Sequence, residues 1–421
     1  MYNWCIDLFP ICRSITGNGI KKTLLYFEKI NPILKRLKFK SGSKVFDWIV
    51  PNEWNIDNAY IKDKFGKKHA EFKKNNLHVV NFSEPVSKKI DKKKLLEKIN
   101  KIKENKKAIP YVTSYYKKQW GFCMSENQKK KLPNGNFHVV IKSKFKKGFL
   151  DLDHAIIRGK SKKEIFFSSY VCHPSMANNE LSGPVVLNAL LKYIKDNYKK
   201  TSFTYRFVLI PETIGSISYL SKFKNIMKRN ILMGFNLSCL GDAKGYSIIK
   251  GPNENCLSFQ ALHSLLKNKK NLKIFDFLER GSDERQYCAP GIDLPITGFC
   301  RSKYNNYPEY HTHLDDLNVI SQKNLEDSLK ILINLVNCCE LSLFPEAKIL
   351  CEPMLSKRKL YPSISKFDTN NPLPKMLNLR KNLLAYSNGK RNIFEISKIL
   401  NVNILDIFEE YKILKKNKLI I

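Results

Sequence analysis

Short apolar runs alternate with helix-like patterns through the middle of the chain. Apolar runs of β type cover residues 164–171, 205–210 and 231–237. Residues 184–195 and 217–227 instead carry apolar side chains at helical spacing. This alternation predicts an α/β fold whose central sheet is mostly parallel. Because the carboxyl ends of parallel strands share one edge of the sheet, ligand chemistry is expected at that edge.

The pattern changes in the first third of the chain. Residues 1–38 have helical spacing, and together with 146–350 they are expected to form one discontinuous core domain. Residues 39–145 are expected to form an inserted β-rich domain, because Pro, Gly and Asn separate short β-type runs there. These runs cover residues 44–50, 77–82 and 137–141.

The C-terminal residues 357–421 form a third unit in this prediction. Residues 377–386, 393–400 and 404–414 are expected to be helices, and 418–421 an end strand. Three short helices and a terminal strand are typical of a winged-helix-like domain, which often binds DNA.

Composition limits the classes of function. The chain has 421 residues and a formal net charge of +36, but only eleven of its 74 basic residues are arginines. Lysines scattered along the whole chain favour a solvated surface over a nucleic-acid site, since such sites draw heavily on arginine. Nucleic-acid binding through the basic tail remains as the minor alternative. No apolar run is long enough to span a membrane.

The cysteine pattern and the N-terminus both favour the cytoplasm. The eleven cysteines form no C-x-x-C pair, and their number is odd, which argues against a zinc ribbon or a disulfide framework. Reduced, buried thiols are expected. The first residues lack the features of a signal peptide, so we expect a cytoplasmic protein.

Polar side chains follow the predicted strands. His173 comes directly after one strand, and Glu180 lies seven residues further on, before a helix. Glu212 follows the next strand. Imidazole and carboxylate groups are the usual ligands of catalytic zinc, and a buried Glu is a candidate general base. Each residue also has a structural interpretation: His173 as a hydrogen-bonded loop residue, and Glu180 or Glu212 as a carboxylate at a helix N-terminus.

Two further polar clusters lie later in the chain, at residues 280–287 and 309–317. Four such clusters in one α/β unit are harder to explain structurally than one. The motifs H-E-x-x-H, G-x-x-x-x-G-K-[ST], G-x-G-x-x-G and G-x-S-x-G are absent from the sequence.

The order of these clusters along the chain resembles that in a bacterial family of aminopeptidase-like proteins. This family lies within the superfamily of zinc aminopeptidases and glutaminyl cyclases. The family pairs an aminopeptidase-like core with an inserted domain of unknown function and a C-terminal winged helix, and it often occurs among genes of surface-polysaccharide biosynthesis. The matching stretches are LFPICRSITGNG, KVFDWIVPNEWNI, NNLHVVNFSEPV, IPYVTSYYKKQWGFC, CHPSMANNELSGPVV, IPETIGS, RGSDERQY and PEYHTHLD.

The resemblance implies a metal site and a mechanism. It implies His173, His311, Glu180 and Asp283 as candidate zinc ligands and Glu212 as the base that takes a proton from a zinc-bound water. His313 could replace His311 in a flipped assignment. Asn179 and Asp315 would support the ligands. Arg280, Arg285, Tyr287 and Tyr310 would contact the substrate.

This sequence departs from the superfamily pattern at several acidic positions. Asn179-Glu180 stands where two-zinc enzymes usually carry Asp-Asn, and Ser238 stands where a carboxylate ligand is usual. Asp242 is the nearest replacement for that carboxylate. One carboxylate of the usual Glu-Glu pair is also absent beside Glu212. These departures favour one zinc ion over two.

Two classes of function follow from this pattern. The first is a zinc-dependent hydrolase of peptide or aminoacyl-amide bonds. Two alternatives to this activity are a single-zinc activity like that of glutaminyl cyclases and a deacylase activity on a surface-polysaccharide precursor. The second is a degenerate peptidase-like binding or regulatory protein that acts through its winged-helix tail. The expected ligand is a small peptide-like or aminoacylated substrate. The chain is also expected to assemble as a homo-oligomer.

Overall fold

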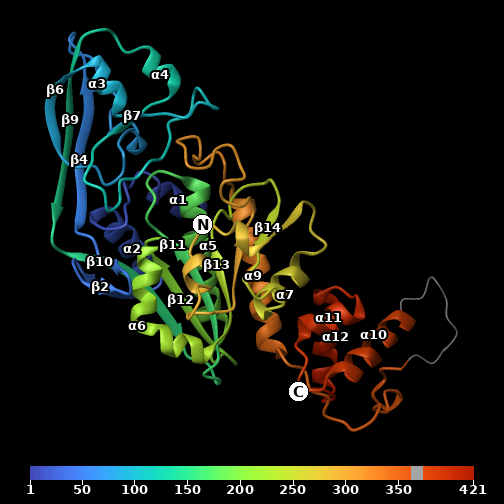
Figure 1. The fold of residues 1–421 in the computed structure, drawn as a ribbon. Helices are drawn as coiled ribbons and strands as arrows, with labels where there is room; N and C mark the ends of the chain where they lie inside the picture. Colours follow the sequence, from blue (N-terminus) through green and yellow to red (C-terminus); the bar gives the residue numbers. More distant parts are fainter. Residues whose placement is uncertain (362–372) are drawn as a thin grey trace.

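The computed structural model describes residues 1–361 and 373–421 (Figure 1). Its core is an eight-stranded sheet with the order β1-β10-β12-β11-β13-β16-β14-β15. The four strands β12, β11, β13 and β16 run parallel, while β10 and β14 flank them in the antiparallel direction. The predicted α/β class is therefore confirmed, with a mixed sheet that is parallel at its centre. The strands are β1 (Lys35–Lys40), β10 (Phe149–Ile157), β11 (Glu164–Tyr170), β12 (Thr204–Ile210), β13 (Ile231–Leu237), β14 (Tyr246–Ile249), β15 (Leu272–Phe275) and β16 (Ile296–Cys300).

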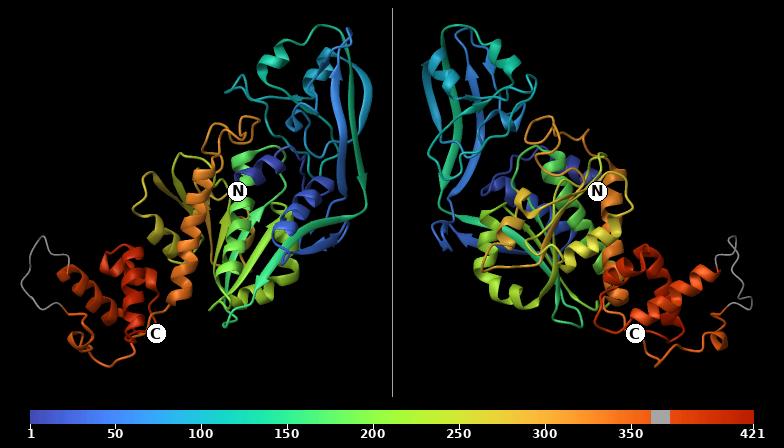
Figure 2. Two further views of the ribbon diagram at one scale, coloured as in Figure 1. Left: turned by 180° about the vertical axis from the view of Figure 1, so that it is seen from behind. Right: turned by 45° about the vertical axis from the view of Figure 1, so that its right-hand side comes forward.

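Helices cover both faces of this sheet (Figures 1 and 2). Successive side chains of a strand point to opposite faces, so Phe166 and Phe167 of β11 enter two different apolar clusters. The cluster that contains Phe167 includes side chains of α2, α5, α7 and α9, and the cluster that contains Phe166 includes side chains of α6 and α8. Burial on both faces explains why these strands are apolar throughout. The helices are α2 (Asn18–Ile30), α5 (Ser182–Asn197), α6 (Ile214–Asn230), α7 (Leu257–Leu266), α8 (Glu284–Tyr287) and α9 (Gln322–Ser342).

The N-terminal segment is only partly helical. Helix α1 (Tyr2–Leu8) and α2 lie in the predicted region, but residues 35–40 form β1, the edge strand that pairs with β10. The prediction of helix up to residue 38 is therefore wrong at its end. The alternating sequence Lys35-Arg36-Leu37-Lys38-Phe39-Lys40 gives the physical reason, since period two suits an edge strand.

The inserted region forms a separate four-stranded antiparallel sheet with the order β5-β4-β9-β6, drawn in blue to green in Figure 1. Residues 77–82, predicted as a strand, instead begin in a 3-10 turn at Asn76–His78, because the Asn75 side chain accepts a hydrogen bond from the Leu77 amide. The elements are β2 (Lys44–Val45), β3 (Trp48–Ile49), β4 (Glu53–Lys62), β5 (Lys68–His69), β6 (Val86–Asp91), α3 (Lys92–Glu97), β7 (Ile99–Asn100), β8 (Phe122–Cys123), α4 (Glu126–Lys130) and β9 (Asn136–Lys146).

The C-terminal unit contains α10 (Leu373–Tyr386), α11 (Ile393–Leu400) and α12 (Ile404–Lys416), close to their predicted positions. The predicted end strand is reduced to a single bridge between Ala347 and Ile420. Part of the predicted domain 357–421, residues 362–372, lies outside the described residues. Among the helices that the structure describes, none is both long and apolar enough to cross a membrane.

Candidate functional site

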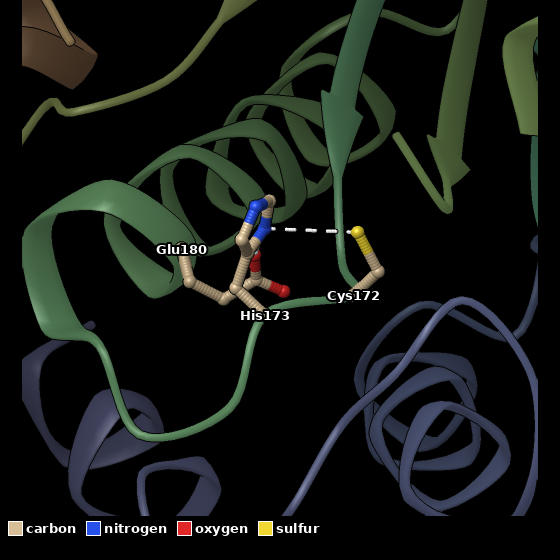
Figure 3. Close-up of side chains that lie close together, drawn as sticks. All are labelled: Cys172, His173 and Glu180. Atoms are coloured by element: carbon tan, nitrogen blue, oxygen red, sulfur yellow. Dashed lines mark hydrogen bonds and ion pairs between the residues drawn. The ribbon is translucent and has the colours of Figure 1, made fainter. Parts of the chain in front are cut away.

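Three metal-binding side chain types converge where β11 ends (Figure 3). Nδ1 of His173 lies 2.8 Å from Oε2 of Glu180 and 3.6 Å from Sγ of Cys172. One ligand atom from each of the three residues lies within 4.8 Å of the other two, and all three residues are buried. The sequence pattern predicted no role for Cys172, and its thiol joins the cluster because this residue directly precedes His173 at the end of β11.

A wide helical turn at Ala177–Leu181 carries Glu180 back towards the end of β11. Helix α5 begins directly afterwards, and Gly183 allows its first turn to approach the sheet. A Cβ atom at Gly183 would lie 2.5 Å from Oγ of Ser169 and 2.6 Å from the carbonyl oxygen of Leu237. The close packing of the first turn of α5 against the sheet therefore explains the glycine in the Leu-Ser-Gly sequence after Glu180. The same packing holds Glu180 beside His173.

Arg13 supplies a buried positive charge next to the cluster. Its Nε donates to the carbonyl oxygen of His173 at 2.8 Å and lies 3.5 Å from Oε1 of Glu180. Burial lowers the pKa of Arg13, and the Glu180 carboxylate opposes that effect. Arg13 belongs to the first quoted stretch, but nothing in local spacing links it to residues 173–180.

Glu212 approaches the same histidine from the neighbouring strand. Strands β11 and β12 are parallel and adjacent, so their carboxyl ends meet, and Oε2 of Glu212 lies 3.6 Å from Nε2 of His173. Burial raises the pKa of Glu212, against the lowering effect of His173 and Arg285. The Glu212 amide also donates to Sγ of Cys172 at 3.2 Å, which ties the two strand ends together.

The residue after Glu212 has a strained backbone. Thr213 has φ 63° and ψ −75°, and the Ile214 amide donates to the Glu212 carbonyl oxygen at 2.8 Å. This is a γ-turn with positive φ, which is rare for a β-branched residue. Asp283 holds the turn, because its Oδ1 accepts from the Thr213 amide at 2.8 Å and from Oγ of Ser216 at 2.7 Å. Burial and the nearby Glu212 raise the pKa of Asp283 to about 8.

The strain at Thr213 can be measured with two substitutions that both remove the hydroxyl group. We expect Thr213→Gly to have a higher free energy of unfolding than Thr213→Ala, by about 1 kcal/mol or more, because only glycine adopts positive φ without steric cost. Urea unfolding of the two variants measures this difference. A Thr213→Ala variant as stable as Thr213→Gly would contradict a strained turn.

His311 lies beside the cluster, in the loop before α9. Its ring stacks on Tyr310 with 3.9 Å between ring centroids and lies 5.4 Å from the ring of His173. Burial, with the charge of His173, lowers the pKa of His311 to about 3, so the imidazole is neutral. His313 points elsewhere, since its Nδ1 accepts from the Ile109 amide at 3.0 Å.

The inserted domain is fixed to this loop by backbone pairing. The Tyr111 amide donates to the carbonyl oxygen of His311 at 2.7 Å, and the His313 amide donates to that of Ile109 at 3.0 Å. As a result, the Tyr111 ring lies 5.1 Å from the rings of both His173 and His311.

A cavity of about 400 Å³ opens over the cluster. Core residues His173, Glu212, Arg285 and His311 line one side of it. The inserted region contributes Trp48, Tyr111, Thr113, Tyr115 and Tyr116 to its lining. The quoted stretch IPYVTSYY contains most of this second group, and its density of aromatic residues was the signal available in the sequence.

Several predicted residues lie away from this cavity. Tyr287 is fully buried, and its hydroxyl group pairs with Oγ of Ser168 at 2.8 Å, so it is a core residue and not a substrate contact. Arg280 stacks on Phe277. Asp242 accepts from the Ser302 amide and from the Asn178 side chain, and therefore does not replace the missing ligand at Ser238.

Two other predicted residues shape the loop that carries Glu180. Asp315 accepts from the amides of Asn178 and Asn179 at 2.7 and 2.9 Å, which fixes the start of the wide turn. The Oδ1 atom of Asn179 accepts from the hydroxyl group of Tyr170 at 2.9 Å. The Nδ2 atom of Asn179 is buried without a hydrogen-bond partner among the described residues.

Residues 2–342 match a family described as a domain of unknown function, DUF4910, and residues 344–421 match a winged helix-turn-helix family. The chain belongs to the DUF4910 family. A Clostridium acetobutylicum relative is 41% identical over 369 residues, covering 86% of this chain and 82% of the relative. That relative is provisionally described as a polysaccharide biosynthesis protein with an aminopeptidase-like domain.

Solved structures confirm the expected fold of this DUF4910 member. A crystal structure from Clostridium acetobutylicum, provisionally described as a peptidase, has a TM-score of 0.90 at 36% identity and covers 100% of this chain and 95% of its own. A zinc aminopeptidase from Bacillus subtilis has a TM-score of 0.58 at 13% identity, covering 80% of this chain and 93% of its own. The second likeness concerns the fold alone.

The winged-helix unit of this family member presents acidic groups on its last helix. Asp406 and Glu409 are exposed in the first half of α12, and Glu409 pairs with Lys412 at 2.7 Å. The helix also packs against α9. Recognition helices contact bases through their first residues, where exposed carboxylates repel phosphate.

We therefore expect weak binding of the full chain to duplex DNA. At 150 mM salt, fluorescence anisotropy with a labelled duplex should give no saturable binding. A steep salt dependence, equivalent to six or more phosphate contacts, that disappears in a Lys412→Glu/Lys416→Glu variant would contradict this expectation.

Proposed function

We propose that this protein is a zinc-dependent hydrolase of amide bonds, of the aminopeptidase type. The observation that carries the proposal is the meeting of His173 and Glu212 at the carboxyl ends of two adjacent parallel strands, inside a cavity of ligand size. This placement supplies a metal-type ligand and a carboxylate base side by side. The similarity in fold to a zinc aminopeptidase from Bacillus subtilis supports the same class.

The residues at the end of β11 fit one zinc ion. Thiolate, imidazole and carboxylate are its usual donors, and Cys172, His173 and Glu180 bring one of each together. Oε1 of Glu180 is buried without a hydrogen-bond partner among the described residues, which a cation would satisfy. When bound, zinc supplies a Lewis acid for the scissile carbonyl group and lowers the pKa of a water molecule.

The protein's own groups would handle the proton and the substrate. Glu212, whose pKa is raised by burial, would accept the proton of the attacking water and pass it to the leaving nitrogen. Arg285 lines the cavity, and its guanidinium group is held by Thr213 and Ser282 at 3.0 Å each. In that position it would orient a carbonyl or hydroxyl oxygen of the substrate.

Metal content and hydrolysis of aminoacyl amides test this proposal together. We expect about one zinc per chain by mass spectrometry of the purified protein. His173→Ala should lose both the metal and the hydrolysis, whereas His138→Ala, in the inserted sheet, should keep both. A wild-type protein without stoichiometric metal, in which His173→Ala changes neither property, would refute the proposal.

A binding or regulatory protein with a degenerate peptidase pocket is the second candidate. The observation in its favour is that Glu180 already has Arg13 and His173 as partners. The resemblance to two-zinc aminopeptidases also implies a carboxylate at the position of Asn179. The description of the Clostridium acetobutylicum relative suggests a role in polysaccharide biosynthesis for either candidate. Ligand binding without turnover in the zinc-loaded protein would favour this second function.

A further inference from the structure

The cavity above Glu212 has an aromatic wall that the metal chemistry does not require. Tyr111 and Tyr115 stand next to the cluster, and their hydroxyl oxygens lie 3.0 Å apart. Trp48 and Tyr116 form the outer rim, with their rings edge to face at 5.5 Å. The rim is fixed in place, because the Tyr116 hydroxyl group donates to the carbonyl oxygen of Ile49 at 3.1 Å.

Much of this aromatic surface is still available to a ligand. Trp48 is 39% exposed and Tyr116 is 50% exposed, although both line the cavity. Trp and Tyr rings combine an apolar face with a polar edge, so they suit a ligand that has apolar C–H faces and many hydroxyl groups. The hydroxyl groups of Thr113 and Thr213 add hydrogen-bonding capacity along the same cavity.

The charges in the cavity disfavour a free amino terminus. Among the described residues that line it, Glu212 is the sole carboxylate, and it is assigned to proton transfer. Arg285 adds a positive charge at the same surface. A desolvated ammonium group needs a negatively charged partner. These lining residues include no second carboxylate that could serve as that partner. A neutral amide substituent avoids this cost.

We propose that the cavity binds an N-acylated amino sugar, with the pyranose against the aromatic wall and the acyl group towards His173 and Glu212. This inference rests on the proposed hydrolase function for its chemistry. Hydrolysis would break the C–N bond of the amide. The oxygen of water would bond to the acyl carbon to give a carboxylate, and the nitrogen would take a proton to give the free amino sugar.

Binding of triacetylchitotriose to the zinc-loaded protein tests the ligand class by titration calorimetry. We expect Trp48→Ala and Tyr116→Ala each to weaken binding about tenfold. Phe65→Ala removes an exposed aromatic side chain from the turn between β4 and β5, where Phe65 is 76% exposed, and this variant should bind like the wild type.

The outcomes separate this inference from the proposed function. Hydrolysis of aminoacyl amides without binding of the trisaccharide at millimolar concentration would overturn the sugar inference and leave the hydrolase proposal intact. Saccharide binding that depends on Trp48, together with an absence of turnover, would support the ligand class and count against the hydrolase. Equal binding by the Trp48→Ala, Tyr116→Ala and wild-type proteins would overturn the role of the aromatic wall.

Discussion

Replacing Glu212 with glutamine is expected to lower kcat for amide hydrolysis at least a hundredfold while the zinc content stays at the wild-type level. Loss of a positioned general base typically costs a factor of 10²–10⁴. Glutamine keeps the size of the side chain but cannot take a proton. Glu212 is not among the three residues whose ligand atoms converge at the end of β11, so the metal donors stay in place.

Steady-state kinetics with parallel metal analysis measures this prediction. Glu279→Gln removes an exposed carboxylate outside the cavity and should leave both kcat and zinc content unchanged. If Glu212→Gln retained wild-type turnover, Glu212 would not be the base. If it lost zinc together with activity, Glu212 would instead be a metal ligand.

Replacing Arg13 with methionine is expected to lower the free energy of unfolding by about 3–5 kcal/mol, the usual cost of removing one partner of a buried ion pair. Arg13 is fully buried, and Glu180 is 1% exposed. Without the guanidinium group, the Glu180 carboxylate would face the interior with His173 as its remaining polar neighbour. The carbonyl oxygens of His173 and Leu8 would also lose their donors.

A double variant tests whether Glu180 is the reason for the loss. Arg13→Met/Glu180→Gln should recover part of the stability, since a neutral amide is cheaper to bury than a carboxylate. Zinc is left out of these urea titrations so that metal binding does not shift the equilibrium. Arg229→Met, at an exposed arginine, is the matched control and should be neutral. A double variant no more stable than Arg13→Met would exclude Glu180 as the cause.

The central strands and the residues that end them could be predicted because the evidence for them is local. An apolar run of strand length is visible in the sequence, and parallel strands must bring their carboxyl ends to one edge. His173 and Glu212 therefore meet in the structure as their positions indicate. Tyr287 shows the limit of this reasoning, because its place in a polar motif suggested a substrate contact while its ring packs on Phe166 in the core.

The contacts of the inserted domain could not be predicted from local patterns. Trp48 and Tyr111 lie more than a hundred residues before Glu212 in the chain, and the backbone pairing of Tyr111 with His311 places the aromatic side of the cavity. No periodicity in residues 39–145 indicates that pairing, since it depends on how the inserted sheet and the core sheet are joined. The same holds for Arg13, whose partners Glu180 and His173 come from a distant strand end.

By itself, the sequence determined the α/β class, the family resemblance and the strand-end positions of His173 and Glu212, because strand periodicity and motif spacing are properties of short segments. The tertiary structure alone decided that Arg13 is the buried partner of Glu180, that Asp283 supports the strained turn at Thr213, and that the inserted domain walls the cavity. Those features depend on distances between segments far apart in the chain, which arise only when the two sheets and the loop before α9 pack together.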